Sequence, residues 1–168
     1  MGAHKLALVF APCEQGKPAL VNIVFSLNLP RDEASVPVVR HICRDALLAL
    51  GVARPCVSEI EVAVSEACTN VLKHVKGTQE SYEVKVEVNE KACEIRVIDT
   101  GAGFDHDSQG REHADHSAEG GRGIFLMRAM VDNIEFTSAP ETGMVVRLTK
   151  NLALDEGSAL TRLVSSDR

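Results

Sequence analysis

The chain has 168 residues, of which 45% are hydrophobic and 25% are charged, and its formal net charge is −6. These fractions are typical of a single soluble globular domain. No apolar run approaches the roughly 20 residues that a membrane span needs, and the first apolar stretch is too short for a secretory signal. We therefore expect a cytoplasmic protein without a membrane partner. The acidic balance also argues against nucleic acid as a direct partner.

The cysteine content points to a reducing compartment. The five cysteines are an odd number and include no C-x-x-C pair, so neither a disulfide framework nor a cysteine zinc site is indicated. We expect reduced thiols, most of them in the core.

The first part of the chain predicts an extended segment followed by a helix. Residues 1–20 lack a clean period and predict an N-terminal arm or leading strand. Residues 22–28 alternate, which is typical of a strand, and Pro30 ends it. Ser35 is a predicted N-cap for an amphipathic helix that Gly51 stops.

The middle of the chain predicts a second helix and a hairpin. Ser58 and Glu61 have the spacing of a capping box ahead of an apolar stripe that runs to Val75. Residues 82–88 and 92–98 both alternate, and the three-residue link between them predicts an antiparallel pair.

The last third opens with a long glycine-rich segment over residues 100–120, which has no periodicity and predicts a mobile loop. A short helix is expected over residues 123–131, and strands are expected over residues 133–138 and 144–149. Residues 151–168 lose the pattern and predict a C-terminal tail.

Two polar residues share one face of the second predicted helix. Glu66 and Asn70 are four residues apart, so their side chains point in nearly the same direction. Their face borders the apolar stripe, where a carboxylate and an amide could converge on a ligand. Two polar side chains flanking an amphipathic stripe would explain the same pair.

An acid followed by glycines ends the second strand of the hairpin. Asp99 precedes Gly101 and Gly103, a pattern that marks a sharp turn or a close approach to a ligand. A dinucleotide fingerprint is excluded because its third glycine would fall at His106, and no P-loop motif is present.

Glycines also precede the last predicted helix, at residues 120–123. Unpaired N–H groups at a helix start attract anions, so this segment suits phosphates, although a flexible hinge would explain the same glycines. Together the three segments predict one site with a mobile lid between the last two.

The three segments resemble a known set of nucleotide-binding motifs. They are E-A-C-T-N at 66–70 with His74, D-T-G-A-G-F at 99–104 and G-G-R-G-I-F-L-M-R at 120–128. In order and spacing they resemble the N, G1 and G2 boxes of the GHKL (Bergerat-fold) ATPases. Within that superfamily, residues 20–150 are most similar to the bacterial anti-sigma factor serine/threonine kinases.

The resemblance implies an α+β two-layer sandwich over residues 21–150. A mixed, mostly antiparallel sheet of about four or five strands would be covered on one face by about three helices, with an ATP lid over about residues 100–120.

The resemblance also implies the roles of the site residues. Asn70 would bind the Mg²⁺ that bridges the ATP phosphates, Glu66 would be the general base, and Asp99 would accept a hydrogen bond from the adenine amine. The other residues assigned to ATP binding are Lys73, His74, Gly101, Gly103, Phe104, Gly120, Gly121, Arg122, Gly123, Ile124 and Met144. Met144 stands where many family members have a threonine.

The implied function is that of an ATP-dependent serine/threonine kinase acting as an anti-sigma factor. It would bind a sigma factor, phosphorylate a STAS-type anti-anti-sigma protein and form a homodimer. The alternative is a regulatory module that binds proteins under the control of ATP without phosphotransfer. Because only the kinase needs a base at Glu66, Glu66→Ala should separate the two.

Overall fold

The computed structural model describes residues 21–74, 80–99, 118–139 and 143–165. In chain order the elements are β1 (Ile23–Pro30), α1 (Ser35–Ala49), α2 (Arg54–His74), β2 (Ser81–Val88), β3 (Ala92–Ile98), α3 (Ala118–Met130), β4 (Asn133–Ala139), β5 (Gly143–Asn151) and α4 (Ala159–Ser165). None of the helices in these ranges is long and apolar enough to cross a membrane.

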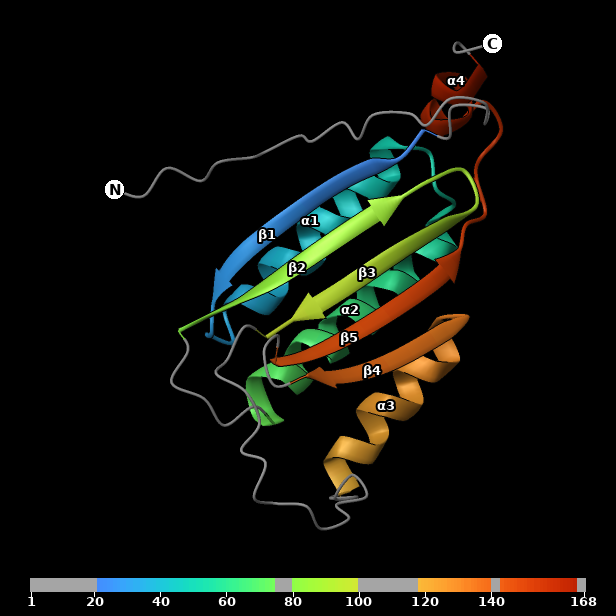
Figure 1. The fold of residues 1–168 in the computed structure, drawn as a ribbon. Coiled ribbons are helices and arrows are strands. Elements are labelled where there is room, and N and C mark those ends of the chain that lie inside the picture. The colour runs from blue at the N-terminus through green and yellow to red at the C-terminus, as the bar shows by residue number, and fades with distance from the viewer. Residues whose placement is uncertain (1–20, 75–79, 100–117, 140–142, 166–168) are drawn as a thin grey trace.

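The elements form two layers, which confirms the expected α+β sandwich (Figure 1). The strands are ordered β1-β2-β3-β5-β4, with α1, α2 and α3 against one face of the sheet. Every strand pair in the described part of the chain is antiparallel, so the sheet that was expected to be mixed has no parallel pair there. The hairpin predicted from residues 82–98 is present, with Val88 opposite Cys93.

The core lies between the sheet and the helices. Along β2, Tyr82, Val84, Val86 and Val88 are buried and alternate with partly exposed residues, as expected for a strand with one covered face. Small and β-branched side chains of α2 pack against this layer, so the helix lies close to the strands without aromatic spacers. The buried apolar residues of α2 are Cys56, Val57, Ile60, Ala63, Val64, Ala67, Cys68 and Val71.

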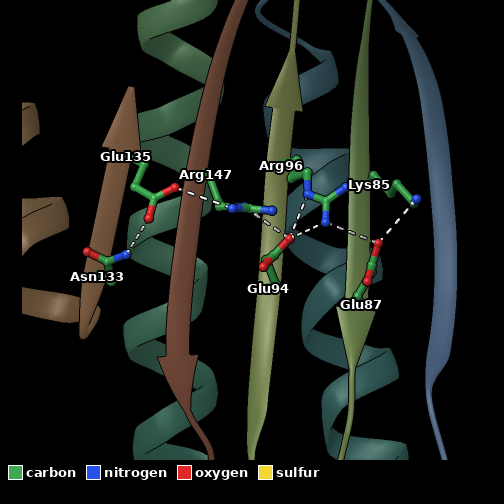
Figure 2. Close-up of polar contacts among 7 residues, drawn as sticks. All are labelled: Lys85, Glu87, Glu94, Arg96, Asn133, Glu135 and Arg147. Carbon is green, nitrogen blue, oxygen red and sulfur yellow. Dashed lines mark hydrogen bonds and ion pairs between the residues drawn. The ribbon is translucent and has the colours of Figure 1, made fainter. Parts of the chain in front are cut away.

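The other face of the sheet carries a ladder of charges (Figure 2). Glu87 lies opposite Glu94, and Arg96 lies opposite Arg147, so like charges are paired across the strands. Ion pairs offset this repulsion: Arg96 contacts both glutamates and Arg147 contacts Glu94 at 3.2 Å, between adjacent rows, and Arg147 contacts Glu135, directly opposite it, at 3.3 Å. This face is therefore neutralised within the chain.

The first residues of α1 and α2 differ from the prediction. Ser35 is the first residue of α1, and its hydroxyl donates to the Asp32 carbonyl and contacts the Tyr82 hydroxyl, so it does not cap the helix. Helix α2 begins at Arg54, and Ser58 lies inside it, because Pro55 fits the first turn, where no N–H is needed.

Helix α3 begins earlier than predicted, at Ala118 instead of residue 123. The glycines at 120–123 therefore lie within its first two turns, and the expectation that they precede the helix is wrong. Packing against α2 overrides their low helix propensity. Of the lid expected over about residues 100–120, residues 118–120 belong to α3 and residues 100–117 lie outside the described residues, as do residues 1–20 and the predicted end of the second helix at Val75.

Part of the segment expected to be a tail is folded. Strand β5 extends to Asn151, and α4 places Leu160 in the core, where its N–H donates to the Leu50 carbonyl at 3.0 Å. Gly51 has a φ of 81°, and a Cβ there would lie 2.5 Å from the Ser158 Cβ. The glycine that ends α1 thus also makes room for this segment.

The buried thiols predict a loss of stability at alkaline pH. The four described cysteines are buried and free, and burial raises the pKa of Cys43 and Cys68 from 9.0 to about 12. In the unfolded chain these thiols ionise near their ordinary pKa, so their contribution to stability is complete below about pH 9 and lost as the pH rises towards 12.

Urea denaturation at a series of pH values tests this expectation. The free energy of unfolding should fall above about pH 9, by up to about 1.4 kcal/mol per pH unit for each thiol. Cys43→Ala should decline less steeply than the parent protein. An equal decline in both proteins would contradict the assignment to this thiol.

Candidate functional site

Two predicted site residues meet where α2 contacts α3. Glu66 is half-buried, and Asn70 is 9% exposed. A Cβ atom on Gly123 would lie 2.8 Å from Glu66 Oε2 and 3.6 Å from Asn70 Oδ1. The carboxylate and the amide oxygen therefore converge on one point of α3, as their spacing on one helix face predicted.

The third predicted residue lies at the end of β3. The side chain of Asp99 is completely buried, and its backbone N–H donates to the Met144 carbonyl at 2.9 Å. The structure therefore brings Met144, which is half-buried, next to the predicted adenine acceptor. Asp99 forms an ion pair with Arg31, whose Nη1 lies 3.3 Å from Asp99 Oδ2.

Sequence analysis did not single out Arg31. It follows β1, far from the three motifs along the chain, and the turn around Pro30 gave no sign of a charged partner. Its Nη2 also donates to the Val71 carbonyl of α2 at 2.8 Å. The arginine thus connects the end of β3 with the helix that carries Glu66 and Asn70.

The remaining predicted residues fall into three groups. Lys73 and Arg122 are exposed, whereas Ile124 is partly buried and packs against the core. Gly120 and Gly121 belong to α3, and His74 ends α2. Gly101, Gly103 and Phe104 lie outside the described residues.

A groove with a volume of about 430 Å³ opens beside Glu66 between α1 and α2. The α1 residues are mostly basic, and the α2 residues are acidic, hydroxylic or apolar. Its lining consists of Arg40, His41, Arg44, Ser58, Glu61, Val62, Ser65 and Glu66. Glu66 thus lines this groove and also lies at the contact with α3.

The side-chain oxygens at the contact between α2 and α3 are suitable ligands for a hard cation. Carboxylate and amide oxygens are the side-chain ligands that Mg²⁺ prefers, and this ion is commonly held by one or two protein groups together with nucleotide phosphates. Asn70 Oδ1 and the Glu66 carboxylate are oxygen ligands of this kind, and both lie within 4 Å of the position that a Cβ on Gly123 would take.

Comparison with known proteins identifies the family. Residues 29–150 match the family model for the histidine kinase-like ATPase domain. The chain belongs to this family. The matched region includes Glu66, Asn70, Asp99 and the glycines of α3, so the resemblance found in the three motifs is confirmed over most of the chain.

Among the relatives are proteins named serine-protein kinase RsbW. The one from Bacillus licheniformis is 31% identical over 147 residues, covering 80% of this chain and 91% of the relative. The one from Halalkalibacterium halodurans is 30% identical over 138 residues, covering 77% and 84%. The one from Bacillus velezensis is 29% identical over 147 residues, covering 80% and 91%.

A solved structure supports the fold. The crystal structure of the RsbU and RsbW domains of a Mycobacterium tuberculosis protein matches 76% of this chain with a TM-score of 0.57 and 19% sequence identity. The chain spans 32% of that longer protein.

The close contact at Gly123 gives a prediction that separates activity from stability. In Gly123→Ala the new Cβ would displace the flexible carboxylate of Glu66, while alanine favours the helix by about 1 kcal/mol over glycine. We therefore expect a melting temperature close to that of the parent protein and at least a tenfold loss of ATP turnover.

Thermal denaturation and an ATP consumption assay would measure the two effects. Ala129→Gly is the matched control, since it makes the reverse change at an exposed site on the same helix. It should lower stability by about 1 kcal/mol and leave turnover unchanged. Full activity in Gly123→Ala would show that the position of Glu66 is unimportant.

Proposed function

We propose that this protein is an ATP-dependent serine/threonine protein kinase. The observation that supports it most directly is the convergence of Glu66 and Asn70 at Gly123, because phosphoryl transfer needs a base and a metal ligand side by side. The relatives named serine-protein kinase support the same activity. The buried carboxylate of Asp99 would recognise the adenine amine.

Each residue would have a distinct task in the transfer. Asn70 would hold Mg²⁺, and the ion would neutralise charge on the ATP phosphates. Glu66 would accept the proton of the acceptor hydroxyl as that oxygen bonds to the γ-phosphorus and ADP leaves. The absence of a side chain at Gly123 leaves space for the Glu66 carboxylate in this position.

We also propose that the chain acts as an anti-sigma factor. The resemblance of the three motifs to the anti-sigma kinases supports this role. The partners would be a sigma factor and a STAS-type anti-anti-sigma protein that carries the acceptor serine or threonine, and the protein would form a homodimer.

The alternative is an ATP-gated module that binds proteins without phosphotransfer. It would use Asn70 and Asp99 in the same way but would not need a base at Glu66. Phosphotransfer therefore discriminates between the two functions.

Labelling with ATP tests the kinase directly. With Mg²⁺ and γ-labelled ATP added to a lysate of its host, the protein should label one small acceptor on serine or threonine. Glu66→Gln keeps the shape of the side chain without the basic carboxylate, so labelling should fall at least a hundredfold while ATP affinity changes little.

The matched control is Glu59→Gln, two turns earlier on α2, where the carboxylate contacts Lys150 at 2.7 Å on the surface. This variant should keep full labelling. If the parent protein binds ATP but labels nothing, the kinase proposal fails and the gated module replaces it.

The groove beside Glu66 gives the acceptor a path to the base. Arg40, His41 and Arg44 form its basic side, so we expect the acceptor to present acidic residues next to its hydroxyl. In Arg44→Glu the KM for the labelled acceptor should rise at least tenfold, whereas the affinity for ATP should stay the same.

Arg162→Glu in α4 is the control for the change of charge, because this arginine is exposed on another element. If Arg40→Glu and Arg44→Glu both leave the acceptor KM unchanged, the acceptor does not use this groove.

A further inference from the structure

Arg31 lies between Asp99, the predicted adenine-binding residue, and α2, the helix that carries the predicted general base Glu66. Its side chain is 11% exposed, and the side chain of its partner Asp99 is completely buried. One guanidinium nitrogen contacts Asp99 Oδ2 at 3.3 Å, and the other donates to the Val71 carbonyl at 2.8 Å. Val71 directly follows Asn70, so one side chain links two parts of the site.

The backbone around Arg31 is held in place. Its N–H donates to the Glu80 carbonyl at 2.9 Å, just before β2 begins. The next residue, Asp32, accepts the Ala34 N–H on its side chain at 2.8 Å and the Ser35 N–H on its carbonyl at 2.9 Å. The arginine therefore extends from a fixed turn, which lowers the entropy cost of holding its guanidinium in one place.

We propose that Arg31 is a positioning residue that sets the preference of the site for adenine. It would hold the Asp99 carboxylate in the orientation that accepts the 6-amino group of the purine, and it would supply the positive charge that a buried carboxylate requires. This inference rests on the proposed function, in which Asp99 binds the base.

The negative charge of Asp99 explains why the site should prefer adenine to hypoxanthine. A carboxylate only accepts hydrogen bonds, so it favours a 6-amino donor and disfavours the 6-oxo acceptor of hypoxanthine. A buried carboxylate without a counter-charge is costly, and it becomes neutral or turns away from the site. Loss of the Arg31 contact should therefore weaken the feature that distinguishes the two purines.

The arginine is compatible with a bound base. A carboxylate accepts several hydrogen bonds at once, and the second guanidinium nitrogen is held by Val71 in the last turns of α2. The guanidinium is thus anchored on the helix side, and the adenine amine would share Asp99 with it.

Equilibrium binding of Mg²⁺-ATP and Mg²⁺-ITP tests the proposal on the full chain, with the ratio of the two Kd values as the main readout. In Arg31→Ala the Kd for ATP should rise at least tenfold and the preference for ATP over ITP should fall at least fivefold. Arg31→Lys, which keeps the charge, should recover part of both. With the acceptor present, the KM for ATP should rise while kcat at saturating ATP stays within about twofold of the parent value, as expected when binding is lost equally in the ground state and the transition state.

Because both nucleotides bind the same folded molecules, the ratio of their Kd values does not depend on how much of a variant is folded. Arg54→Ala is the matched control, since this exposed arginine begins α2, about 25 Å along the helix from Val71. It should leave the ratio unchanged. A loss of stability without a change in the ratio would assign Arg31 a purely structural role and overturn the proposal.

Asp99→Asn separates this inference from the proposed function. If Asp99→Asn loses the preference for ATP and Arg31→Ala keeps it, the base-binding role of Asp99 stands and the role of Arg31 is wrong. If Asp99→Asn keeps both affinity and preference, the assignment of Asp99 itself fails. Tighter ATP binding by Arg31→Ala would show that the arginine competes with the base, which also overturns the proposal.

Discussion

The placement of the site depends on the burial of α2 against several neighbours at once. This helix contacts α1, α3, β3 and β5, and its residues Ile60, Val64, Ala67 and Val71 are buried in the core. A rotation of the helix about its axis would expose these side chains, which costs on the order of 1 kcal/mol or more for each. The rotation is therefore fixed, and Glu66 and Asn70 are held at the edge of the core.

The glycines of α3 lower the stability of that helix, and the one at the contact with α2 leaves space for side chains of α2. A glycine inside a helix costs about 0.5–1 kcal/mol relative to alanine, and α3 contains three of them in its first two turns. At Gly123 the missing side chain leaves space for the oxygens of Glu66 and Asn70. Gly123, which was expected to belong to a phosphate-binding loop, thus leaves room for α2 side chains at this contact.

The two faces of the sheet deal with charge in different ways. On the open face, acidic and basic side chains form ion pairs with one another at the surface (Figure 2), where each pair adds little to stability. At the edge of the core, the Asp99 side chain is completely buried and forms an ion pair with Arg31, and removing one partner of a buried ion pair is generally destabilising. Together with the bond from Arg31 to the Val71 carbonyl, this buried pair links β3 with α2.

The sequence by itself determined the order of the elements from β1 to β5 and the antiparallel hairpin over residues 82–98, because these depend on local periodicity and spacing. It placed Glu66 and Asn70 on one face because a helix fixes the direction of residues four apart. Only the tertiary structure decided that α3 includes its glycines, that residues 159–165 form a helix over the end of α1, and that Arg31 reaches Asp99. Each of these depends on contacts between segments far apart in the chain, which supply the packing or the charge that local propensity lacks.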